Sequence, residues 1–201
     1  MKNITIAIAT ILLNIAAFAN NSEGDPKTMK IDSKKSKVQW IAEKVTGTHD
    51  GHVTIKEGSL TISNNEITGG EVILDMTTIT VDDIKDESTN AKLKGHLLSD
   101  DFFSVAKNPA STFKLKKFSP LKSPDGNNYT VTGTLTIKGI SNDISFPAKI
   151  DITGNLVTAS ADVTFDRTKW DIRYNSGSFF DGLGDYMIYD DVKIKFNIVA
   201  Q

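Results

Sequence analysis

The sequence contains no cysteine and only three histidines in 201 residues. The lack of cysteine excludes disulfides, thiolate metal sites, a cysteine nucleophile and attachment as a bacterial lipoprotein through an acylated cysteine. No Gly-x-Ser-x-Gly sequence marks a serine nucleophile, and the glycines form neither a phosphate-binding loop nor a dinucleotide fingerprint. The sequence therefore shows no standard catalytic arrangement, and the fold has to be stabilised by its core without cross-links.

An excess of one charge is also lacking. The chain has 23 basic and 25 acidic residues, which gives a formal net charge of −2. Proteins that bind nucleic acid usually carry a strongly basic surface. We therefore expect no nucleic-acid partner.

A single long apolar run lies at the N-terminus. Lys2 precedes the run from Ile4 to Phe18, and Ala17-Phe18-Ala19 has the small-x-small form of a signal-peptidase site. The run is interrupted by Asn14 and is shorter than the ~20 apolar residues that span a bilayer. We therefore interpret it as a Sec-type signal peptide and not as a membrane anchor.

This interpretation sets the expected domain organisation. Residues 1–19 form the signal peptide, and cleavage after them leaves a periplasmic or secreted protein without a transmembrane segment. Residues 20–30 are polar and show no periodicity, so we expect a flexible lead-in there. The remaining residues, 31–201, are of a length typical of one domain.

Apolar and polar residues alternate over most of that domain, which predicts strands with one face in a core. The clearest stretch runs from Tyr129 to Lys138, and the residues from Lys138 to Asn142 then predict a hairpin turn into the next strand. Pro147 indicates an edge or a bulge in that strand. Other alternating segments are centred on Trp40, Leu60, Leu74, Phe113, Ala161 and Phe196. Eight or nine strands are expected, and because several reach about ten residues they favour closure into an antiparallel barrel.

The alternation is interrupted twice. Between Thr77 and Val105, the residues from Ser88 to Leu98 predict a short helix that could serve as a lid or plug. The second interruption, Asp166 to Asp190, is rich in aromatic residues, and a long stretch without periodicity is usually functional or an elaborated loop.

Histidine chemistry offers one candidate site. His49 and His52 flank Asp50, and His96 lies far along the chain. Such residues could bind a metal ion if the fold brought them together. The plainer interpretation is that Gly47 to His52 is a loop between two strands, with its histidines exposed or bonded locally.

A cluster of basic and aromatic residues offers another. Arg167, Trp170, Arg173 and Tyr174 lie within eight residues and could contact an anionic or polar ligand head group. Alternatively, the two arginines pair with Asp166, Asp171 or Asp185 to hold a loop, with Trp170 in the core. The sequence leaves both interpretations open.

Several strings resemble those of the YceI-like family. They are Lys44-Val45-Thr46-Gly47-Thr48-His49-Asp50-Gly51, the segment from Gly95 to Phe103, Asn108 to Phe113, Val131 to Gly139, Asp166 to Tyr174, and Ser176 to Asp181. The His-Asp-Gly-His string and the aromatic C-terminal insertion resemble a branch common in Bacteroidetes-type bacteria. The resemblance implies an eight-stranded, lipocalin-like barrel that holds a polyisoprenoid chain, such as a quinone or prenyl-phosphate tail.

These observations predict an exported lipid-binding protein that is not an enzyme and needs no cofactor, although an isoprenoid lipid or quinone could be bound. The expected apolar lining consists of Trp40, Leu97, Phe102, Phe103, Phe113, Phe146, Trp170, Phe179 and Phe180. The expected head-group contacts are Arg167, Arg173 and Tyr174. Two alternatives are a filled barrel that acts as an interaction or stress-response module and a metal-dependent enzyme using the histidines. Two barrels could also pair as a homodimer through an exposed edge.

Overall fold

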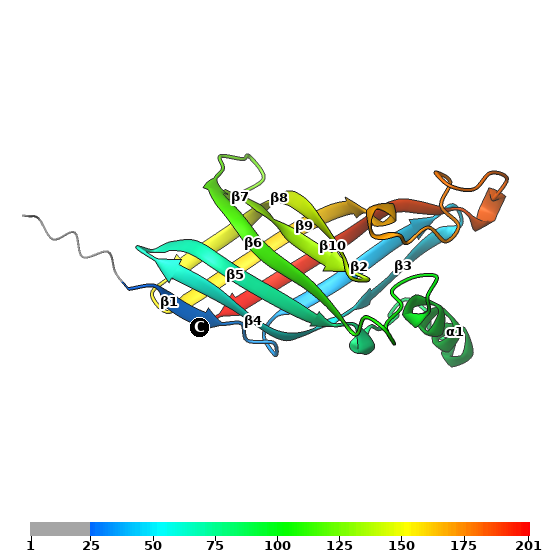
Figure 1. Cartoon of the computed structure of the whole chain (residues 1–201), viewed down its shortest axis with the longest axis horizontal. Helices are drawn as coiled ribbons and strands as arrows, with labels where there is room; N and C mark the ends of the chain where they lie inside the picture. The colour runs from blue at the N-terminus through cyan, green and yellow to red at the C-terminus, as the bar shows by residue number, and fades with distance from the viewer. Residues whose placement is uncertain (1–24) are drawn as a thin grey trace, which may run out of the picture.

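The computed structural model describes residues 25–201, and its main feature is one strongly curled antiparallel sheet (Figure 1). Ten strands follow one another across it in the order β1-β4-β5-β6-β7-β8-β9-β10-β2-β3. The strands are β1 (Lys27–Lys30), β2 (Lys37–Lys44), β3 (Gly47–His52), β4 (Thr54–Ser63), β5 (Glu66–Asp75), β6 (Ala110–Pro120), β7 (Tyr129–Ile137), β8 (Ile140–Thr153), β9 (Leu156–Asp166) and β10 (Ile188–Ala200). The expected signal peptide lies outside the described residues.

The predicted all-β antiparallel architecture is confirmed, but the predicted closed barrel of eight strands is wrong, because the ten strands form an open, strongly curled sheet with β1 and β3 at its two edges. The first unexpected strand, β1, lies in residues expected to form a flexible lead-in. It pairs with β4 and buries Met29. The second, β3, occupies Gly47–His52, which was interpreted as a loop, and pairs with β2. Both strands are held by backbone hydrogen bonds to a neighbouring strand. Such bonds do not require alternating apolar residues, so the sequence pattern did not predict these strands.

The β7–β8 hairpin shows how closely local sequence can determine a turn. Ile137 pairs with Ile140, so the turn is only Lys138 and Gly139, with φ of 51° and 74°. Positive φ at both positions is typical of the two-residue turns that match strand twist. The predicted turn was too long, because Ser141 and Asn142 already pair with β7.

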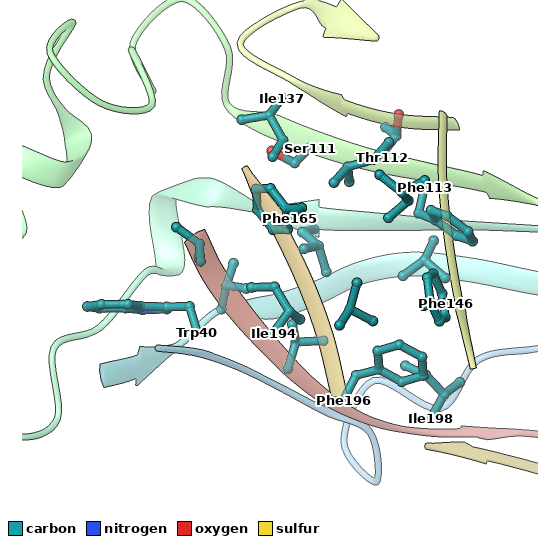
Figure 2. Close-up of a pocket in the computed structure, with 18 of the residues that line it drawn as sticks. Trp40, Ser111, Thr112, Phe113, Ile137, Phe146, Phe165, Ile194, Phe196 and Ile198 are labelled. Carbon is teal, nitrogen blue, oxygen red and sulfur yellow. The ribbon is translucent and has the colours of Figure 1, made fainter. Parts of the chain in front are cut away.

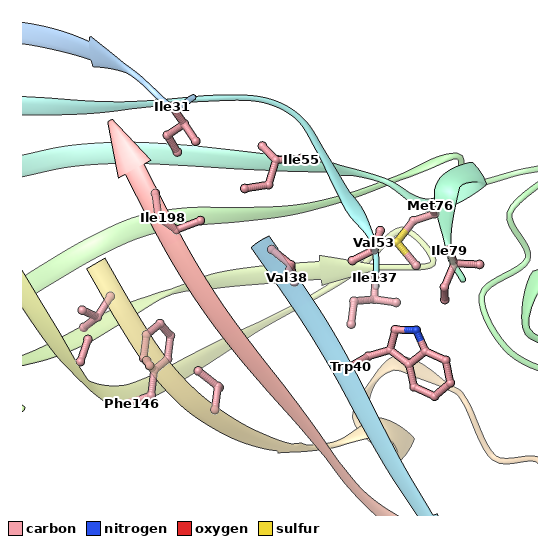
Figure 3. Close-up of a cluster of buried hydrophobic side chains, with 14 of the residues drawn as sticks. Ile31, Val38, Trp40, Val53, Ile55, Met76, Ile79, Ile137, Phe146 and Ile198 are labelled. Carbon is pink, nitrogen blue, oxygen red and sulfur yellow. The ribbon is translucent and has the colours of Figure 1, made fainter. Parts of the chain in front are cut away.

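The sheet curls far enough to bring distant parts of the chain together. Ile31, just after β1, forms an antiparallel bridge with Ala200 of β10. The backbones of Lys30 and Gln201 exchange two hydrogen bonds of 3.0 Å, and Val53, between β3 and β4, donates to Val38 of β2 at 3.0 Å. The inner face of the sheet therefore surrounds the apolar core, part of which Figure 3 shows.

One part of the wall lacks a continuous backbone ladder. Strands β8 and β9 pair only between Lys149–Thr153 and Leu156–Ser160. Beyond this ladder, the short 3-10 helix η2 (Arg167–Trp170) contacts β8 and β10. The indole nitrogen of Trp170 donates to the carbonyl of Leu135 at 3.0 Å, and its ring packs edge-on against Phe165. Side chains thus close the wall where the two strands separate.

The predicted short helix is confirmed as α1 (Glu87–Leu98), which lies at one end of the curled sheet (Figure 1). Asp86 caps its first turn by accepting from the backbone nitrogen of Thr89. The 3-10 helix η1 (Met76–Thr78) and a segment from Ile79 to Asp86 lead from β5 to α1. Within residues 25–201, no helix has the length and apolar character needed to span a bilayer.

The predicted irregular segment between β9 and β10 is also present. It contains η2 and the 3-10 helix η3 (Gly184–Tyr186), and it lies at the same end of the molecule as α1 (Figure 1). Both interruptions of the strand pattern therefore meet at one end of the sheet.

Candidate functional site

The inner face of the curled sheet lines an apolar cavity of about 250 Å³ that is partly open. Strands β2 and β4 to β10 contribute to its lining, as do Leu97 of α1 and the segment after that helix. Figure 2 shows many of these side chains converging from opposite strands. The polar residues in the lining are Glu71, Ser111, Thr112 and Arg167.

The size of the cavity shows that the interior is not fully packed. An apolar cavity of roughly 150 Å³ can hold a molecule as large as benzene. The inward-facing residues Phe113, Phe165 and Phe196 retain exposed surface although they line the interior. Core residues in a filled interior would instead be almost completely inaccessible.

The structure brings six of the nine predicted lining residues to the cavity. These are Trp40, Leu97, Phe102, Phe103, Phe113 and Phe146. Trp170 is buried outside the cavity lining, whereas Phe179 and Phe180 are about half exposed and also lie outside it. A direct contact of any of these residues with a ligand stays a prediction.

The inner faces of β9 and β10 contribute further lining residues: Ala159, Val163, Phe165, Ile194, Phe196 and Ile198. Each occupies an alternate position in its strand, so the period-two pattern in the sequence already predicted that they share one face. They were not among the nine residues expected to contact a ligand, because alternation does not show which inner residues border a cavity.

Ser111 adds a polar group to this apolar surface. It pairs with Leu74 across β5 and β6, and both residues line the cavity. Its side chain is 4% exposed, and its hydroxyl makes no hydrogen bond with the described residues. Figure 2 shows Ser111 beside Ile137 in the cavity wall. A hydroxyl in an otherwise apolar lining can donate or accept a hydrogen bond, so this group is suited to a polar atom of a ligand.

Arg167 lies at the cavity but is already bound by the protein. Its Nε, Nη1 and Nη2 atoms donate to the carbonyls of Tyr189, Ile172 and Ile188 at 2.9–3.1 Å, and Nη2 lies 3.3 Å from Asp190 Oδ1. Burial lowers the pKa of Arg167, while the negative charge of Asp190 opposes that effect. These contacts favour the loop-holding interpretation, and a head-group contact stays a prediction.

The other two predicted head-group residues lie nearer the surface. Arg173 pairs with Asp171 at 3.0 Å and covers the ring of Phe179 at 4.5 Å. Tyr174 packs against His96 and Phe102, with ring centroids 4.4 and 5.5 Å apart. Because Phe102 lines the cavity, Tyr174 lies next to its wall.

The three histidines do not gather in one place. His49 contacts Asp83 at 2.7 Å, His52 contacts Asp82, and His96 contacts Asp101 at 3.0 Å. No group of three or more potential metal-ligating side chains occurs within residues 25–201. The loop interpretation expected the histidines to be exposed or bonded locally. His52 is exposed, but the contacts of His49 and His52 are not local, because they reach 30 residues or more along the chain.

The His49–Asp83 and His52–Asp82 pairs attach the segment before α1 to the edge of β3. The backbone strengthens the attachment, since Thr80 donates to His52 and Asp82 donates to Asp50. Burial raises the pKa of Asp82, but hydrogen bonds from Thr80 and His52 outweigh it and leave the pKa below the ordinary 3.8. The pKa of Asp83 is lowered in the same way, mainly by its hydrogen bond with His49.

Comparison with solved structures identifies the same fold in proteins from bacteria. BcnA of Burkholderia cenocepacia aligns with a TM-score of 0.63 and 22% identity, covering 85% of this chain and 99% of BcnA. A polyisoprenoid binding domain from Saccharophagus degradans, described as implicated in plant cell wall breakdown, aligns with a TM-score of 0.59 and 12% identity. That alignment covers 86% of this chain and 97% of the domain.

Sequence comparison adds more direct relatives. A UPF0312 protein of Pseudomonas paraeruginosa is 30% identical over 99 residues, which cover 49% of this chain and 47% of that protein. The chain thus spans about half the length of this relative. The comparisons give no support to the Bacteroidetes-type branch. The profile of the YceI-like domain matches residues 29–200. The match extends from β1 to the end of β10, so the chain belongs to the YceI-like domain family.

Proposed function

We propose that this chain is a binding protein that holds a long apolar molecule of the polyisoprenoid type in the cavity of its curled sheet. The observation that carries the proposal is the unfilled, almost entirely apolar interior. The relative from Saccharophagus degradans, which shares the fold, is described as a polyisoprenoid binding domain and supports this ligand class.

Burial against the apolar lining can supply the binding free energy of such a ligand. Burying a methylene contributes about 0.8 kcal/mol, so a five-carbon isoprene unit contributes about 4 kcal/mol before ordering costs. A few units therefore give strong binding without polar contacts along the chain. Ser111 can then accept or donate one hydrogen bond to an oxygen of the ligand.

The proposal assigns no reaction to the protein. His49, His52 and His96 each pair with a different aspartate, and residues 25–201 contain no cluster of three or more potential metal-ligating side chains. A carrier, storage or stress-related role fits this arrangement. We also propose that the protein works in the periplasm or outside the cell, on the basis of the signal-peptide pattern in residues 1–19. Fractionation of cells that express the full chain tests this location.

Ligand binding is tested by two measurements on the same purified protein. Mass spectrometry of extracted lipid should detect an isoprenoid, and a fluorescent prenyl alcohol should bind to the lipid-free protein with a saturable signal. If no lipid is extracted and the probe fails to bind, the proposal is wrong.

A matched pair of substitutions tests whether the probe binds in the cavity of the sheet. Ala159 lines the cavity, whereas its neighbour Thr158 does not and faces the opposite side of β9. Ala159→Phe should fill part of the cavity and weaken probe binding at least about tenfold, which corresponds to 1.4 kcal/mol. Thr158→Phe should leave binding unchanged. Equal binding by both variants would place the probe elsewhere.

A further inference from the structure

Large apolar side chains are exposed mainly at one end of the molecule. Six of them form what we call the aromatic end surface: Val45, Tyr174, Phe179, Phe180, Tyr186 and Tyr189. Tyr186 is 77% exposed, and Phe180 is 51% exposed. The backbone nitrogen of Val45 donates to the carbonyl of Met187 at 3.2 Å, so the β2–β3 turn adjoins the segment between η2 and β10.

The opposite end lacks a comparable surface within the described residues. Leu156 is exposed there, in the β8–β9 turn. Lys27 of β1 bonds with Asn155 at 2.6 Å, which places this turn beside β1 and far from α1 (Figure 1). Exposed apolar groups scattered singly are ordinary, whereas groups concentrated at one end indicate a contact surface.

The aromatic end surface adjoins the cavity through Tyr174. Tyr174 packs against Phe102, a lining residue, and against His96 of α1. Phe179 is linked to Tyr174 through Arg173, whose guanidinium covers the Phe179 ring. A molecule that contacts this surface therefore lies beside the part of the wall formed by α1 and the segment after it.

The segment that carries five of these six side chains has an acidic excess, which bears on the kind of surface it fits. Residues 171–191 contain one basic residue, Arg173, against five aspartates: Asp171, Asp181, Asp185, Asp190 and Asp191. Anionic membranes attract basic segments and would repel this one. Phenylalanine and tyrosine instead favour the boundary between headgroups and acyl chains, where an apolar ring and a polar tip are both accommodated.

We propose that the aromatic end surface docks the protein onto a zwitterionic phospholipid bilayer, so that an apolar ligand passes between the membrane and the cavity. The inference rests on the proposed function, because a cavity for a water-insoluble chain needs contact with a lipid phase. Docking buries the exposed rings of Phe179, Phe180 and Tyr186 in the bilayer boundary. It needs no electrostatic attraction and is therefore insensitive to salt.

Flotation with phosphatidylcholine vesicles tests the proposal directly. The wild-type chain should float with the vesicles at low and high salt. Phe179→Ser combined with Phe180→Ser should lower the partition coefficient at least about tenfold, because two rings lose their apolar burial. Tyr186→Ser, at the most exposed position, gives a second variant with little effect on folding. All proteins share the same N-terminal residues, so differences between them report on this surface.

Leu156→Ser is the matched control, since it removes an exposed apolar side chain at the opposite end. It should float like the wild type. Prenyl-probe binding in vesicle-free solution is measured on every variant and should stay unchanged in Tyr186→Ser and Leu156→Ser, which replace residues outside the expected lining. If the wild type does not bind the probe, the proposed function is wrong. If the wild type binds the probe but does not float, only the docking proposal is wrong.

Four outcomes would overturn the inference. The first is a wild-type chain that stays unbound, and the second is flotation that all the variants retain. The third is self-association, seen by light scattering as a concentration-dependent mass increase that the phenylalanine substitutions abolish while vesicles remain unbound. That result would assign the surface to a second copy of the chain. Binding restricted to anionic vesicles and lost at high salt would equally contradict an apolar docking surface.

Discussion

At the scale of single residues, the polar groups of the cavity wall differ in whether the protein already satisfies them. Arg167 is bound by three carbonyls and lies beside Asp190, whereas the hydroxyl of Ser111 has no partner among residues 25–201. A satisfied group stabilises the fold, and an unsatisfied one is available to a ligand. The two residues therefore have distinct expected effects when they are replaced.

Replacing Ser111 with alanine should change binding but not stability. A ligand with a hydroxyl or carbonyl oxygen should bind about 0.5–1.5 kcal/mol more weakly, the usual net value of one hydrogen bond. Titration with a fluorescent prenyl alcohol measures this difference, and a hydrocarbon probe of the same length serves as control. Equal losses for both probes would contradict a hydrogen bond at Ser111.

Replacing Arg167 with methionine should destabilise the fold strongly. The substitution leaves Asp190, which is one-fifth exposed, without its cation, and such losses typically cost about 3–5 kcal/mol. Urea unfolding measures the change. Adding Asp190→Asn should recover part of the loss, because the double variant no longer buries an unpaired charge. If Arg167 served only a ligand, lipid-free protein would show little change in unfolding.

At the scale of elements, the segment before α1 depends on two aspartate–histidine contacts at the edge of β3. The pKa values of Asp82 and Asp83 lie below the ordinary 3.8 in the folded protein. A carboxyl group with a lowered folded pKa contributes stability above its unfolded pKa and loses it as pH falls through the folded value. The attachment should therefore persist at neutral pH and weaken only at pH below 3.8.

Hydrogen exchange of residues 79–98 at decreasing pH tests this expectation. After correction for intrinsic exchange rates, protection in the wild type should fall below pH 3.8. A variant with Asp82→Asn and Asp83→Asn should show reduced protection already at neutral pH and little further acid dependence. Asp162→Asn, on the exposed face of β9, provides a control that should follow the wild type. Loss of wild-type protection near neutral pH would contradict the assignment to these carboxyl groups.

Some strands could be predicted from the sequence, and others could not. Strands such as β7 and β10 were predictable because their apolar residues alternate against polar ones. Strand β3 was not, because Gly47–His52 has no apolar alternation and is held by backbone pairing to β2. A Cβ atom at Gly51 would lie 1.9 Å from the carbonyl oxygen of Thr80, so that glycine permits a close backbone approach. Contacts of this kind depend on residues distant in sequence.

At the scale of the whole molecule, the cavity follows from how the strands are arranged, not from any one of them. Alternation predicted the inner residues of β9 and β10, yet it could not distinguish a hollow interior from a filled one. Phe179 and Phe180 were expected at the cavity because they lie in an aromatic segment, but the fold exposes them at its end. Their surroundings depend on how residues 171–187 cross that end, which no periodic pattern specifies.

A hollow interior should make stability depend on the ligand. A molecule that binds only the folded state stabilises it by about 2.7 kcal/mol at 100 times its dissociation constant. Lipid-free protein should therefore unfold at lower temperature, and adding a prenyl alcohol should restore the loss in a concentration-dependent manner. Differential scanning calorimetry measures both effects. Ala159→Phe should be less sensitive to the ligand, and identical responses from this variant and the wild type would argue against cavity binding.

The short ladder between β8 and β9 has a consequence for the permeability of the wall. Over most of the sheet, opening a passage requires backbone hydrogen bonds to break. Beside Trp170, where the ladder has ended, side-chain contacts form the barrier. They include the hydrogen bond from the indole to Leu135, the contact of its ring with Phe165 and the hydrogen bond from Asn142 to the carbonyl of Lys169. Small uncharged solutes such as dissolved oxygen should therefore reach the interior there first. An enclosed unsaturated chain would be least protected from oxidation at the carbons nearest this seam.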